Sequence, residues 1–503
     1  MFSVHIALSV AFAPPAARWP GIPAHGVRSL AARVASPRAS APDSLDSRIV
    51  PTTKTLRVTL SPSPTVPPKE VDWWRQWYPL TSTRALRNDQ PNSYRLLEKP
   101  LVVWKSADGW RVAEDRCPHR GAPLSYGRLE SNCELTCSYH GWQFASDGSA
   151  AHVPTSHAPG CAACLRVHPT QVCEHGLLWV WPQSCAPGSA EEAAALEKPL
   201  PNAHLPPPDC TITDWTVNRV PIPWASLVEN TIDDAHGVHA HHGLAGIDRT
   251  LAAPALKVRS GQVGDGEAFS TWCNVTYPFT KPSDASPSLH VNSYRFVAPI
   301  ATTARFGNSY RAEGFIVPGA YDETLLVSAG FSTPSPGLGG RLLVGAQRQN
   351  PFLTAVLHRL GTAIACQDAV LAEADGLDDL RDERWTGEQA KGGLTTSDGA
   401  VKRVRMWLRR SGGPPLQPAR EDVKRWAVRD RLSVWEMHVK HCPTCRRAHD
   451  DAAFTAKVLL GFSAAAAASG QLAPALALAA TSEASRVTSE WFETFDVNFD
   501  NHR

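Results

Sequence analysis

Two short segments of this 503-residue chain each combine a cysteine with a histidine. In "CPHRGAP" one residue separates Cys117 from His119, and in "CSYHGWQF" two residues separate Cys137 from His140. Thiolates and imidazoles are the side chains that bind soft transition metals and iron–sulfur clusters. The glycines and prolines around both pairs permit tight turns that bring such loops face to face. The two pairs therefore predict one metal centre with four protein ligands.

The order of the ligands distinguishes between the centres that two Cys and two His can hold. A Cys₂His₂ zinc finger places its two Cys together and its two His together. A Rieske [2Fe–2S] cluster has two His in place of two Cys on one of its irons. Here the order is Cys–His followed by Cys–His. The interleaved order favours a Rieske cluster, with zinc as the alternative.

The same loops indicate which kind of Rieske cluster to expect. Rieske proteins of respiratory and photosynthetic complexes carry an extra Cys in each loop, and the two form a disulfide. Ala122 and Tyr139 occupy the candidate positions here, and Cys133 has no evident mate in the first loop. We therefore expect the lower-potential cluster of an oxygenase or a ferredoxin, and an electron carrier alone would not need the 250 further residues.

A second constellation of ligand residues is "ENTIDDAHGVHAHHG", Glu229 to Gly243. Mononuclear non-haem Fe(II) oxygenases bind iron with two His and one carboxylate, which leaves open positions for O₂ and substrate. A His-rich segment is often only a solvated helix face, and His239 and His242 blur the assignment. Four His, an Asp and a Rieske-type motif upstream favour the interpretation as iron ligands.

Spacing suggests how this segment is folded. Asp233 and His236 are three residues apart, which predicts that they lie on one face of a helix. The five-residue step from His236 to His241 does not fit a regular helix, so we expect the helix to loosen or end near Gly237.

The third iron ligand must come from a later segment. In "IACQDAVLAEAD", Asp368 follows Gln367 within an otherwise apolar helical pattern. A lone Asp in such a helix costs stability unless it is paired or bound to metal. The alternative is an N-cap or exposed Asp, a description that fits the acidic run of Asp375, Asp378 and Asp379 better. We therefore predict Asp368 as the carboxylate ligand.

A third motif is Cys442-Pro-Thr-Cys445, near the end of the chain. A Cys-x-x-Cys pair is half of a zinc site, a redox dithiol or two idle thiols. No second Cys-x-x-Cys lies nearby to complete a zinc site, and Cys161-Ala-Ala-Cys164 has no recognisable pattern around it.

Composition places these motifs in a multidomain α+β chain. The net charge is only +2, so no nucleic-acid partner is indicated, and 12 Cys do not make a disulfide scaffold. Short β-type runs precede a region that mixes strands with helices. We predict a targeting presequence at 1–42, which contains no Asp or Glu, and a Pro/Ser-rich linker at 43–70. The Rieske domain then covers 71–185, the catalytic domain 205–431 and the C-terminal region 432–503.

The C-terminal region contains an uncharged run from Val458 to Ala480. A membrane-spanning helix needs about 20 apolar residues, and this run is long enough. It is only weakly hydrophobic, however, and contains Gln471 and Pro474. A buried or interfacial helical hairpin and a membrane span are both compatible with it.

Together these motifs resemble one branch of the Rieske oxygenases, the pheophorbide a oxygenase group of plastids with its translocon-associated and protochlorophyllide-linked relatives. Chlorophyllide a oxygenase is more distant, because it lacks the terminal Cys pair. The resemblance covers Trp73 to Arg503. It is carried by "WYP", "DRCPHRGAPLS", "CSYHGWQF", "GLLWVWP", "LVENTIDDAHGVHAHHG", "QDAVL", the terminal Cys-x-x-Cys and "TFDVNFDNHR".

The resemblance implies a fold and a set of residue roles. The fold would be an antiparallel β Rieske domain, an α+β helix-grip-like catalytic domain and a helical tail. Asp233 would orient a ligand His and pass electrons from a Rieske cluster. The cluster ligands would be Cys117, His119, Cys137 and His140. The mononuclear Fe(II) would be bound by His236, His241 and Asp368, and a regulatory dithiol would be formed by Cys442 and Cys445.

It also implies partners and a location. Reduced ferredoxin or a similar reductase would supply the electrons. The substrates would be O₂ and a chlorophyll-derived tetrapyrrole, and thioredoxin would act on the Cys pair. The assembly would be a homotrimer in a plastid, with one or two membrane anchors in the family. The N-terminus resembles the two-part presequences of complex algal plastids, and an ordinary plastid or mitochondrial presequence is the alternative.

The chain also departs from the family pattern around the active-site segment. Asp234, Val238, His239 and His242 stand where relatives have Pro and Tyr. Two alternatives therefore stay open. One is a Rieske hydroxylase of another plastid pigment or lipid, and the other is a Rieske electron carrier or redox sensor with an inactive second site.

Overall fold

The computed structural model describes most of the chain after residue 69. The described residues are 70–154, 164–201, 211–233, 236–242, 244, 257–279, 288–306, 310–332, 350–372, 398–416 and 432–493. All belong to one compact unit. The predicted presequence, nearly all of the linker, Asp375 and its acidic neighbours, Asp234, Cys161 and the closing "TFDVNFDNHR" lie outside these residues. The predicted domain boundaries stay predictions.

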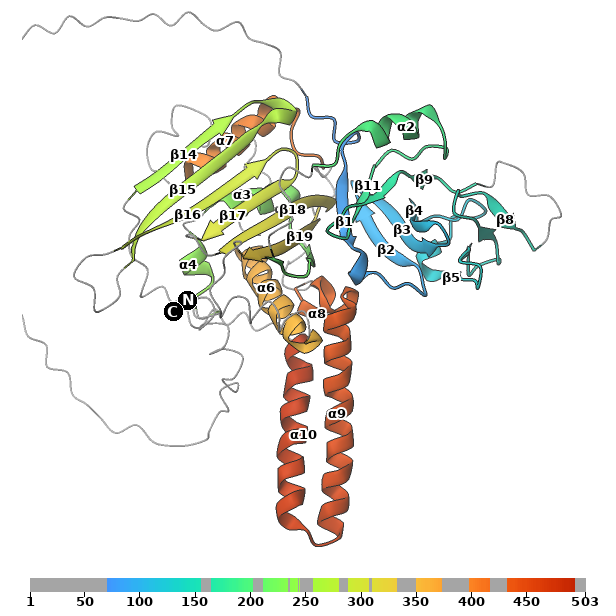
Figure 1. Ribbon diagram of the computed structural model, residues 1–503, viewed down its shortest axis with the longest axis vertical. Helices are drawn as coiled ribbons and strands as arrows, with labels where there is room; N and C mark the ends of the chain where they lie inside the picture. The colour runs from blue at the N-terminus through green and yellow to red at the C-terminus, as the bar shows by residue number, and fades with distance from the viewer. Residues whose placement is uncertain are drawn as a thin grey trace, which may run out of the picture. The chain divides into compact units, whose positions relative to one another are not determined.

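The first part of the described chain consists of antiparallel β-sheets, as expected (Figure 1). Three sheets have the strand orders β1-β11-β10, β2-β3-β4-β9 and β5-β6-β7-β8. Strand β3 is central in its sheet and is buried from Leu101 to Trp104, whereas the edge strand β2 alternates buried and exposed residues. The strands are β1 (Tyr78–Ser82), β2 (Asn92–Leu96), β3 (Lys99–Ser106), β4 (Gly109–Glu114), β5 (Arg128–Leu129), β6 (Leu135–Thr136), β7 (Gln143–Phe144), β8 (Ala150–His152), β9 (Val167–His168), β10 (Thr170–Val172) and β11 (Leu177–Val180).

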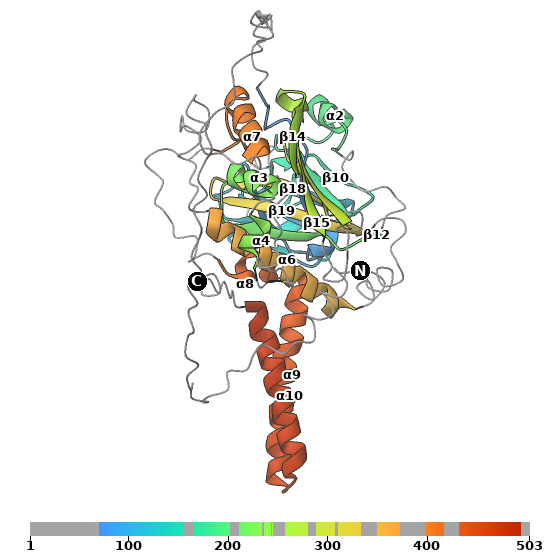
Figure 2. The same ribbon diagram turned by 90° about the vertical axis from the view of Figure 1, so that its left-hand side faces the viewer.

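The second part is built on an eight-stranded antiparallel sheet with the order β12-β19-β18-β17-β16-β15-β14, and β13 also pairs with β19. Helix α3 (Trp224–Ile232) packs on β16, β18 and β19, and α7 (Gly399–Arg410) packs on β14 and β15 (Figures 1 and 2). The strands are β12 (Thr211–Ile212), β13 (Thr216–Val220), β14 (Lys257–Val263), β15 (Ser270–Phe279), β16 (Ser288–Val297), β17 (Ala301–Phe306), β18 (Tyr310–Ala320) and β19 (Glu323–Ser332). The observed order, an antiparallel β domain followed by an α+β domain, confirms the predicted fold class.

Aromatic side chains join the two parts into one core. Trp73, which precedes β1, contacts Trp224 of α3 edge-on with ring centroids 5.2 Å apart. Trp179 of β11 meets Phe315 of β18 in the same way at 5.1 Å. Burial of large aromatic rings contributes strongly to stability. The short helix α2 (Ala190–Glu197), which Ser189 caps, lies between the predicted Rieske domain and the predicted catalytic domain.

Two long helices follow the short elements α8 (Val434–Met437) and η13 (Val439–His441). Helix α9 (Pro443–Ala468) and helix α10 (Leu472–Glu493) pack side by side as an antiparallel hairpin that extends away from the sheets (Figures 1 and 2). Pro474 lies in the first turn of α10, where its missing N–H leaves no hydrogen bond unmade. The uncharged run is therefore a helical hairpin, but a buried one is wrong, because Phe462 and Leu476 are 60% and 64% exposed.

Candidate functional site

The two Cys–His loops of the first part have the same backbone design. The Gly121 N–H donates to the Cys117 carbonyl, and the Gly141 N–H donates to the Cys137 carbonyl, at 2.8 and 3.0 Å. Each Cys N–H in turn donates to the carbonyl five residues on, at 2.8 Å in both loops. Both glycines have φ of +72°, a conformation that a side chain would strain. The repeated turn places Cys117 and Cys137 in equivalent positions, and each loop adds a His before its glycine, His119 two residues and His140 one residue ahead.

The two thiols point inward and the two imidazoles outward. Cys117 and Cys137 are buried, whereas His119 is exposed and His140 half-buried. The two imidazole rings lie beside each other, with centroids 4.6 Å apart. Burial raises the pKa of the Cys117 thiol to about 11, and the neighbouring Cys137 thiol adds to the shift. Such thiols bind a metal as thiolates, because the metal displaces their protons.

This arrangement bears on the zinc alternative. A single tetrahedral ion needs all its ligand atoms close together. Among the described residues, two groups of His, Cys, Asp or Glu place their ligand atoms within 4.8 Å of one another, and these four residues are not one of the groups. A Cys pair set apart from a His pair is what a two-iron cluster requires.

One of the two compact groups is His236, His241 and Asp368. Asp368 Oδ1 lies 3.4 Å from His236 Nε2 and 3.3 Å from His241 Nε2. For metal–ligand bonds of about 2.1 Å, neighbouring ligands of an octahedral ion are about 3 Å apart. The three side chains thus lie at nearly the spacing of ligands on one face of an ion.

A break between two helices brings the two histidines together. Helix α3 ends at Ile232, and the short helix α4 (Gly237–Ala240) begins after His236. The expected interruption near Gly237 is present, but the expected shared helical face of Asp233 and His236 is wrong. Asp233 has extended backbone angles (φ −91°, ψ 107°), because it follows the last helical residue. Its Oδ2 nevertheless lies 3.8 Å from His236 Nδ1.

Asp368 comes from helix α6 (Pro351–Ala372), 127 residues after His241 in the chain. It is buried and lies in the C-terminal part of the helix, so it is neither an N-cap nor an exposed residue. His239 is exposed and His242 half-buried, and neither belongs to the compact group among the described residues.

The structure adds a residue that orients one imidazole: Gln367 Oε1 lies 3.0 Å from His241 Nδ1. The Asn230 amide nitrogen lies 3.3 Å from His236 Nε2, the nitrogen that faces Asp368, and a metal bound there would replace this contact. A proton on His241 Nδ1 would donate to Gln367 and leave Nε2 free for a metal. Sequence reasoning noted Gln367 only as a neighbour of Asp368. The signal that could have identified Gln367 was its position, because it is a polar residue beside the only acidic residue of an apolar helix.

These residues fit a metal ion. Asp368 Oδ1 is buried without a hydrogen-bond partner among the described residues. Burial alone would lower the pKa of His236, but the nearby carboxylates of Asp368 and Asp233 outweigh it and raise that pKa. A buried carboxylate oxygen between two imidazoles attracts positive charge, which a divalent cation provides.

Cys442 and Cys445 lie elsewhere, at the start of α9, and both are free, buried thiols. His358 and His438 accompany them in the second compact group. Sequence reasoning found only the two Cys. It missed the histidines because neither stands in a recognisable motif and His358 lies 84 residues before Cys442.

Comparisons with known proteins agree with the cluster motif. The Rieske [2Fe-2S] domain model matches residues 76–169. The chloroplastic pheophorbide a oxygenase of Oryza sativa subsp. japonica is 29% identical over 461 residues, which cover 85% of this chain and 83% of that protein. Flavonoid 8-hydroxylase 2 of Ocimum basilicum, also chloroplastic, is 27% identical over 420 residues, 76% of this chain and 75% of that protein.

Two further matches are shorter or more distant. The protochlorophyllide-dependent translocon component 52 of Arabidopsis thaliana is 35% identical over 182 residues, 34% of this chain and 32% of that protein. A crystal structure of dicamba monooxygenase bound to dicamba covers 68% of this chain and 98% of its own, with 20% identity and a TM-score of 0.49. The chain therefore contains a Rieske [2Fe–2S] domain and is similar, over most of its length, to the pheophorbide a oxygenase group of Rieske non-haem iron oxygenases.

Proposed function

We propose that this oxidoreductase binds a Rieske [2Fe–2S] cluster and a mononuclear iron and uses O₂ to oxygenate a large, flat pigment molecule. The observation that carries the proposal is the convergence of His236, His241 and Asp368, in a chain that also presents two Rieske loops. Neither an electron carrier nor a structural protein needs a buried two-His, one-carboxylate group.

The residues have distinct roles in this proposal. The [2Fe–2S] cluster is held by Cys117, His119, Cys137 and His140, and the mononuclear iron by His236, His241 and Asp368. Iron bound there supplies the chemistry that activates O₂. Gln367 holds His241 with Nε2 toward the metal position, and Asp233 provides a negative charge beside His236 Nδ1. Burial of His241 and Asp368 keeps water away from the ligands.

Reduced ferredoxin, or a similar small reductase, is the electron donor that suits the cluster surface. His119 is exposed, and the exposed side chains of Arg116 and Arg120 lie in the same loop. Positive charge around an accessible cluster ligand favours encounter with an acidic electron carrier. A donor of this kind delivers one electron at a time to the cluster.

The first candidate substrate is a chlorophyll-derived tetrapyrrole. A relative named pheophorbide a oxygenase matches 85% of this chain, and it is chloroplastic, which also supports a plastid location. A flavonoid or another plastid pigment is the second candidate, because a flavonoid 8-hydroxylase matches 76% of the chain. Both candidates are flat, largely apolar ring systems.

The α9–α10 hairpin supports membrane association. Small residues form its seam at seven-residue spacing: the Ser463 hydroxyl donates to the Ala475 carbonyl and the Ser482 hydroxyl to the Ala456 carbonyl, both at 2.7 Å. Large apolar side chains point outward instead, namely Phe454, Leu460, Phe462, Leu472 and Leu476, each at least 60% exposed. Helices that pack against each other in lipid have this pattern, with small residues in the seam between them and large apolar residues on the outer surface.

The length of the uncharged tip indicates how deeply the hairpin inserts. Helix α9 has the length and composition to cross a membrane. Its charges end at Lys457, however, and those of α10 resume at Glu483, which leaves eleven uncharged helical residues on each arm. Eleven residues rise about 16 Å, roughly half of the hydrocarbon thickness. We propose that the hairpin enters one leaflet without crossing the bilayer.

Vesicle flotation of the full-length protein tests this insertion. The wild type is expected to float with vesicles of neutral lipid, and Leu460→Glu/Leu476→Glu to stay in solution. A tip accessible to protease from the far side of the vesicle would contradict insertion into one leaflet. Equal flotation of the double variant would contradict membrane insertion altogether.

Turnover with isotope-labelled O₂ tests the enzymatic proposal. The purified protein receives reduced ferredoxin, ¹⁸O₂ and a panel of pheophorbide a, protochlorophyllide, chlorophyllide, open-chain chlorophyll catabolites and flavonoids. Labelled oxygen in a tetrapyrrole product is expected, with Asp368→Ala as the inactive control. Labelled product from a flavonoid alone would establish the second candidate. No labelled product from protein proven to contain both iron centres would overturn both substrate candidates.

A further inference from the structure

The base of the hairpin contains a second set of metal-binding side chains. Cys442 and Cys445 come from the start of α9, His438 precedes η13, and His358 comes from α6. All four are buried, with exposed fractions between 0% and 7%. Their ligand atoms lie within 4.8 Å of one another. Four such side chains rarely converge in a protein interior without a reason, because each is costly to bury unpaired.

The distances match the edges of a tetrahedron. His358 Nδ1 lies 3.6 Å from Cys442 Sγ and 3.7 Å from Cys445 Sγ, and His438 Nε2 lies 3.2 Å from Cys445 Sγ. With Zn–S and Zn–N bonds of about 2.3 and 2.0 Å, neighbouring ligands of tetrahedral zinc are about 3.3–3.8 Å apart. A zinc ion therefore fits at the centre with small adjustments.

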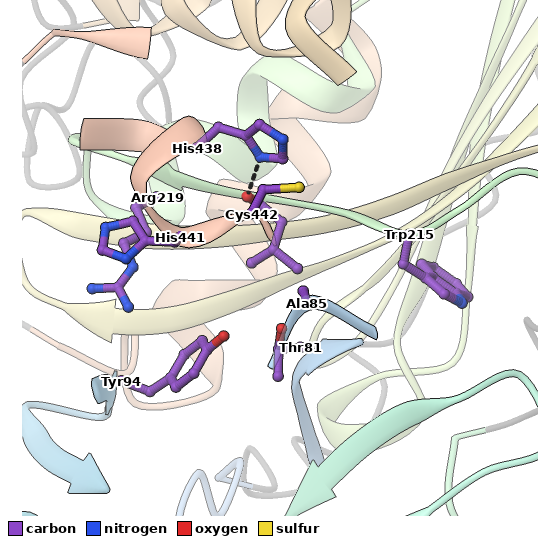
Figure 3. Close-up of a pocket in the computed structure, with 9 residues that line it drawn as sticks. Thr81, Ala85, Tyr94, Trp215, Arg219, His438, His441 and Cys442 are labelled. Atoms are coloured by element: carbon purple, nitrogen blue, oxygen red, sulfur yellow. Dashed lines mark hydrogen bonds between the residues drawn. The ribbon is translucent and has the colours of Figure 1, made fainter. Parts of the chain in front are cut away.

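The surroundings also suit a metal. His438 Nδ1 lies 2.9 Å from the Val217 carbonyl of β13, which can only accept a hydrogen bond. The proton is therefore on Nδ1, and Nε2 keeps its lone pair, 3.2 Å from Cys445 Sγ. Figure 3 shows His438, with its hydrogen bond dashed, beside Cys442. Cys442 is the N-cap of α9 and Pro443 its first residue. The partial positive charge of a helix N-terminus favours thiolates there.

We propose that His358, His438, Cys442 and Cys445 form a structural zinc site. Its four protein ligands are buried and leave no open position, which is the pattern of structural rather than catalytic zinc. The ion would tie helix α6 to the base of the hairpin. Asp368 lies ten residues after His358, about 15 Å farther along the same helix. The zinc site would thereby fix the helix that presents Asp368.

A dithiol switch explains less of this arrangement. The thioredoxin-type regulation implied by the family resemblance stays a prediction, and it requires access of another protein to the sulfurs. Cys445 is 0% exposed and Cys442 is 7% exposed. A Cys442–Cys445 disulfide would also leave two buried imidazoles directed at sulfurs that no longer need them. A zinc ion uses all four side chains.

Metal analysis of the full-length protein tests the proposal. Zinc and iron per chain are measured for the wild type, Cys442→Ser/Cys445→Ser, His438→Ala and the control Cys185→Ser, which lies outside all three centres. We expect one zinc in the wild type and the control and none in the other two variants. In the wild type, mercurial titration of buried thiols should release that zinc to a chromophoric chelator.

Three results would overturn the zinc site. They are wild-type protein without zinc, zinc that persists in both ligand variants, and a Cys442–Cys445 disulfide in protein as isolated. If the double-Cys variant fails to fold, the wild-type titration still decides, because thiols that react without releasing zinc contradict the proposal. The readout is independent of oxygenase activity, so failure here leaves the proposed function standing.

Discussion

At the residue scale, both proposed histidine ligands of the iron have another side chain at Nδ1, and Asp368 lies between the two imidazoles. His241 faces Gln367, and His236 faces Asp233. Groups that orient metal ligands typically change metal affinity or activity by about 10- to 100-fold when removed. The contacts of Asp233 and Gln367 differ, and their substitutions should therefore differ in effect.

Replacing Asp233 with Ala should uncouple the two iron centres. The carboxylate contacts His236 Nδ1 at 3.8 Å but is not itself in the compact group of ligands. We expect both centres to stay loaded while reoxidation of the reduced cluster by O₂ and substrate slows at least about tenfold. Stopped-flow absorbance of the cluster measures this rate, with Asp233→Asn as the isosteric control. Reoxidation of Asp233→Ala at the wild-type rate would contradict the role.

Replacing Gln367 with Leu should instead weaken iron binding. Without the Gln367 oxygen, nothing described holds His241 Nδ1, so Nε2 is no longer directed at the metal. We expect the affinity for Fe(II) to fall by about 10- to 100-fold while the cluster absorbance is unchanged. Fe(II) titration of the apo site gives the affinity. Gln367→Glu retains an acceptor and should bind nearly as well as the wild type; equal affinity of the Leu variant would refute the account.

At the element scale, the strands and the long helix were predictable, whereas the break in the active-site helix was only partly so. Alternating and fully apolar runs such as "LVVWKS" and "TLLVSAGF" indicated β3 and β19, and the pattern around Asp368 indicated α6. The interruption near Gly237 followed from the His spacing. The end of α3 at Ile232 did not, because extended backbone at Asp233 depends on tertiary contacts of neighbouring elements.

A buried ion pair holds α3 against α7 just ahead of this break. Arg405 Nε donates to Glu229 Oε1 at 2.7 Å, and both side chains are largely buried. Arg405→Ala leaves a buried carboxylate without this partner, and we expect it to lower the free energy of unfolding by about 3–5 kcal/mol. Arg410→Ala on the same helix removes an exposed pair with Asp265 and should cost less than about 1 kcal/mol. Denaturant unfolding that gives equal losses would falsify the comparison.

At the scale of the whole molecule, long-range convergence is what the sequence did not reveal. The cluster loops were predictable because each stands within one short motif. The partners of His241 and Cys442 come from α6, 126 and 84 residues away, and only the folded chain shows them together. The second part's sheet and helices position the iron ligands, while the first part's loops present the cluster at its own surface.

We propose that electrons pass between chains of the homotrimer that the family resemblance implies. Within one chain, the cluster loops adjoin strands β5–β8 of the first part, whereas His236 and Asp368 belong to the second part. In such a trimer, one chain's cluster would lie beside the next chain's iron. Co-expressed His140→Ala and Asp368→Ala chains should then recover a substantial fraction of the activity that each lacks alone. Mixed oligomers with no activity above the separate variants would argue for transfer within one chain.

The most direct test of the central claim is the iron content of the purified protein. A cluster and a mononuclear centre give three irons per chain, whereas a Rieske electron carrier with an inactive second site gives two. We predict three irons in the wild type and two in Asp368→Ala, with the cluster absorbance equal in both. Two irons in the wild type, or three in the variant, would contradict the assignment of His236, His241 and Asp368 as an iron site.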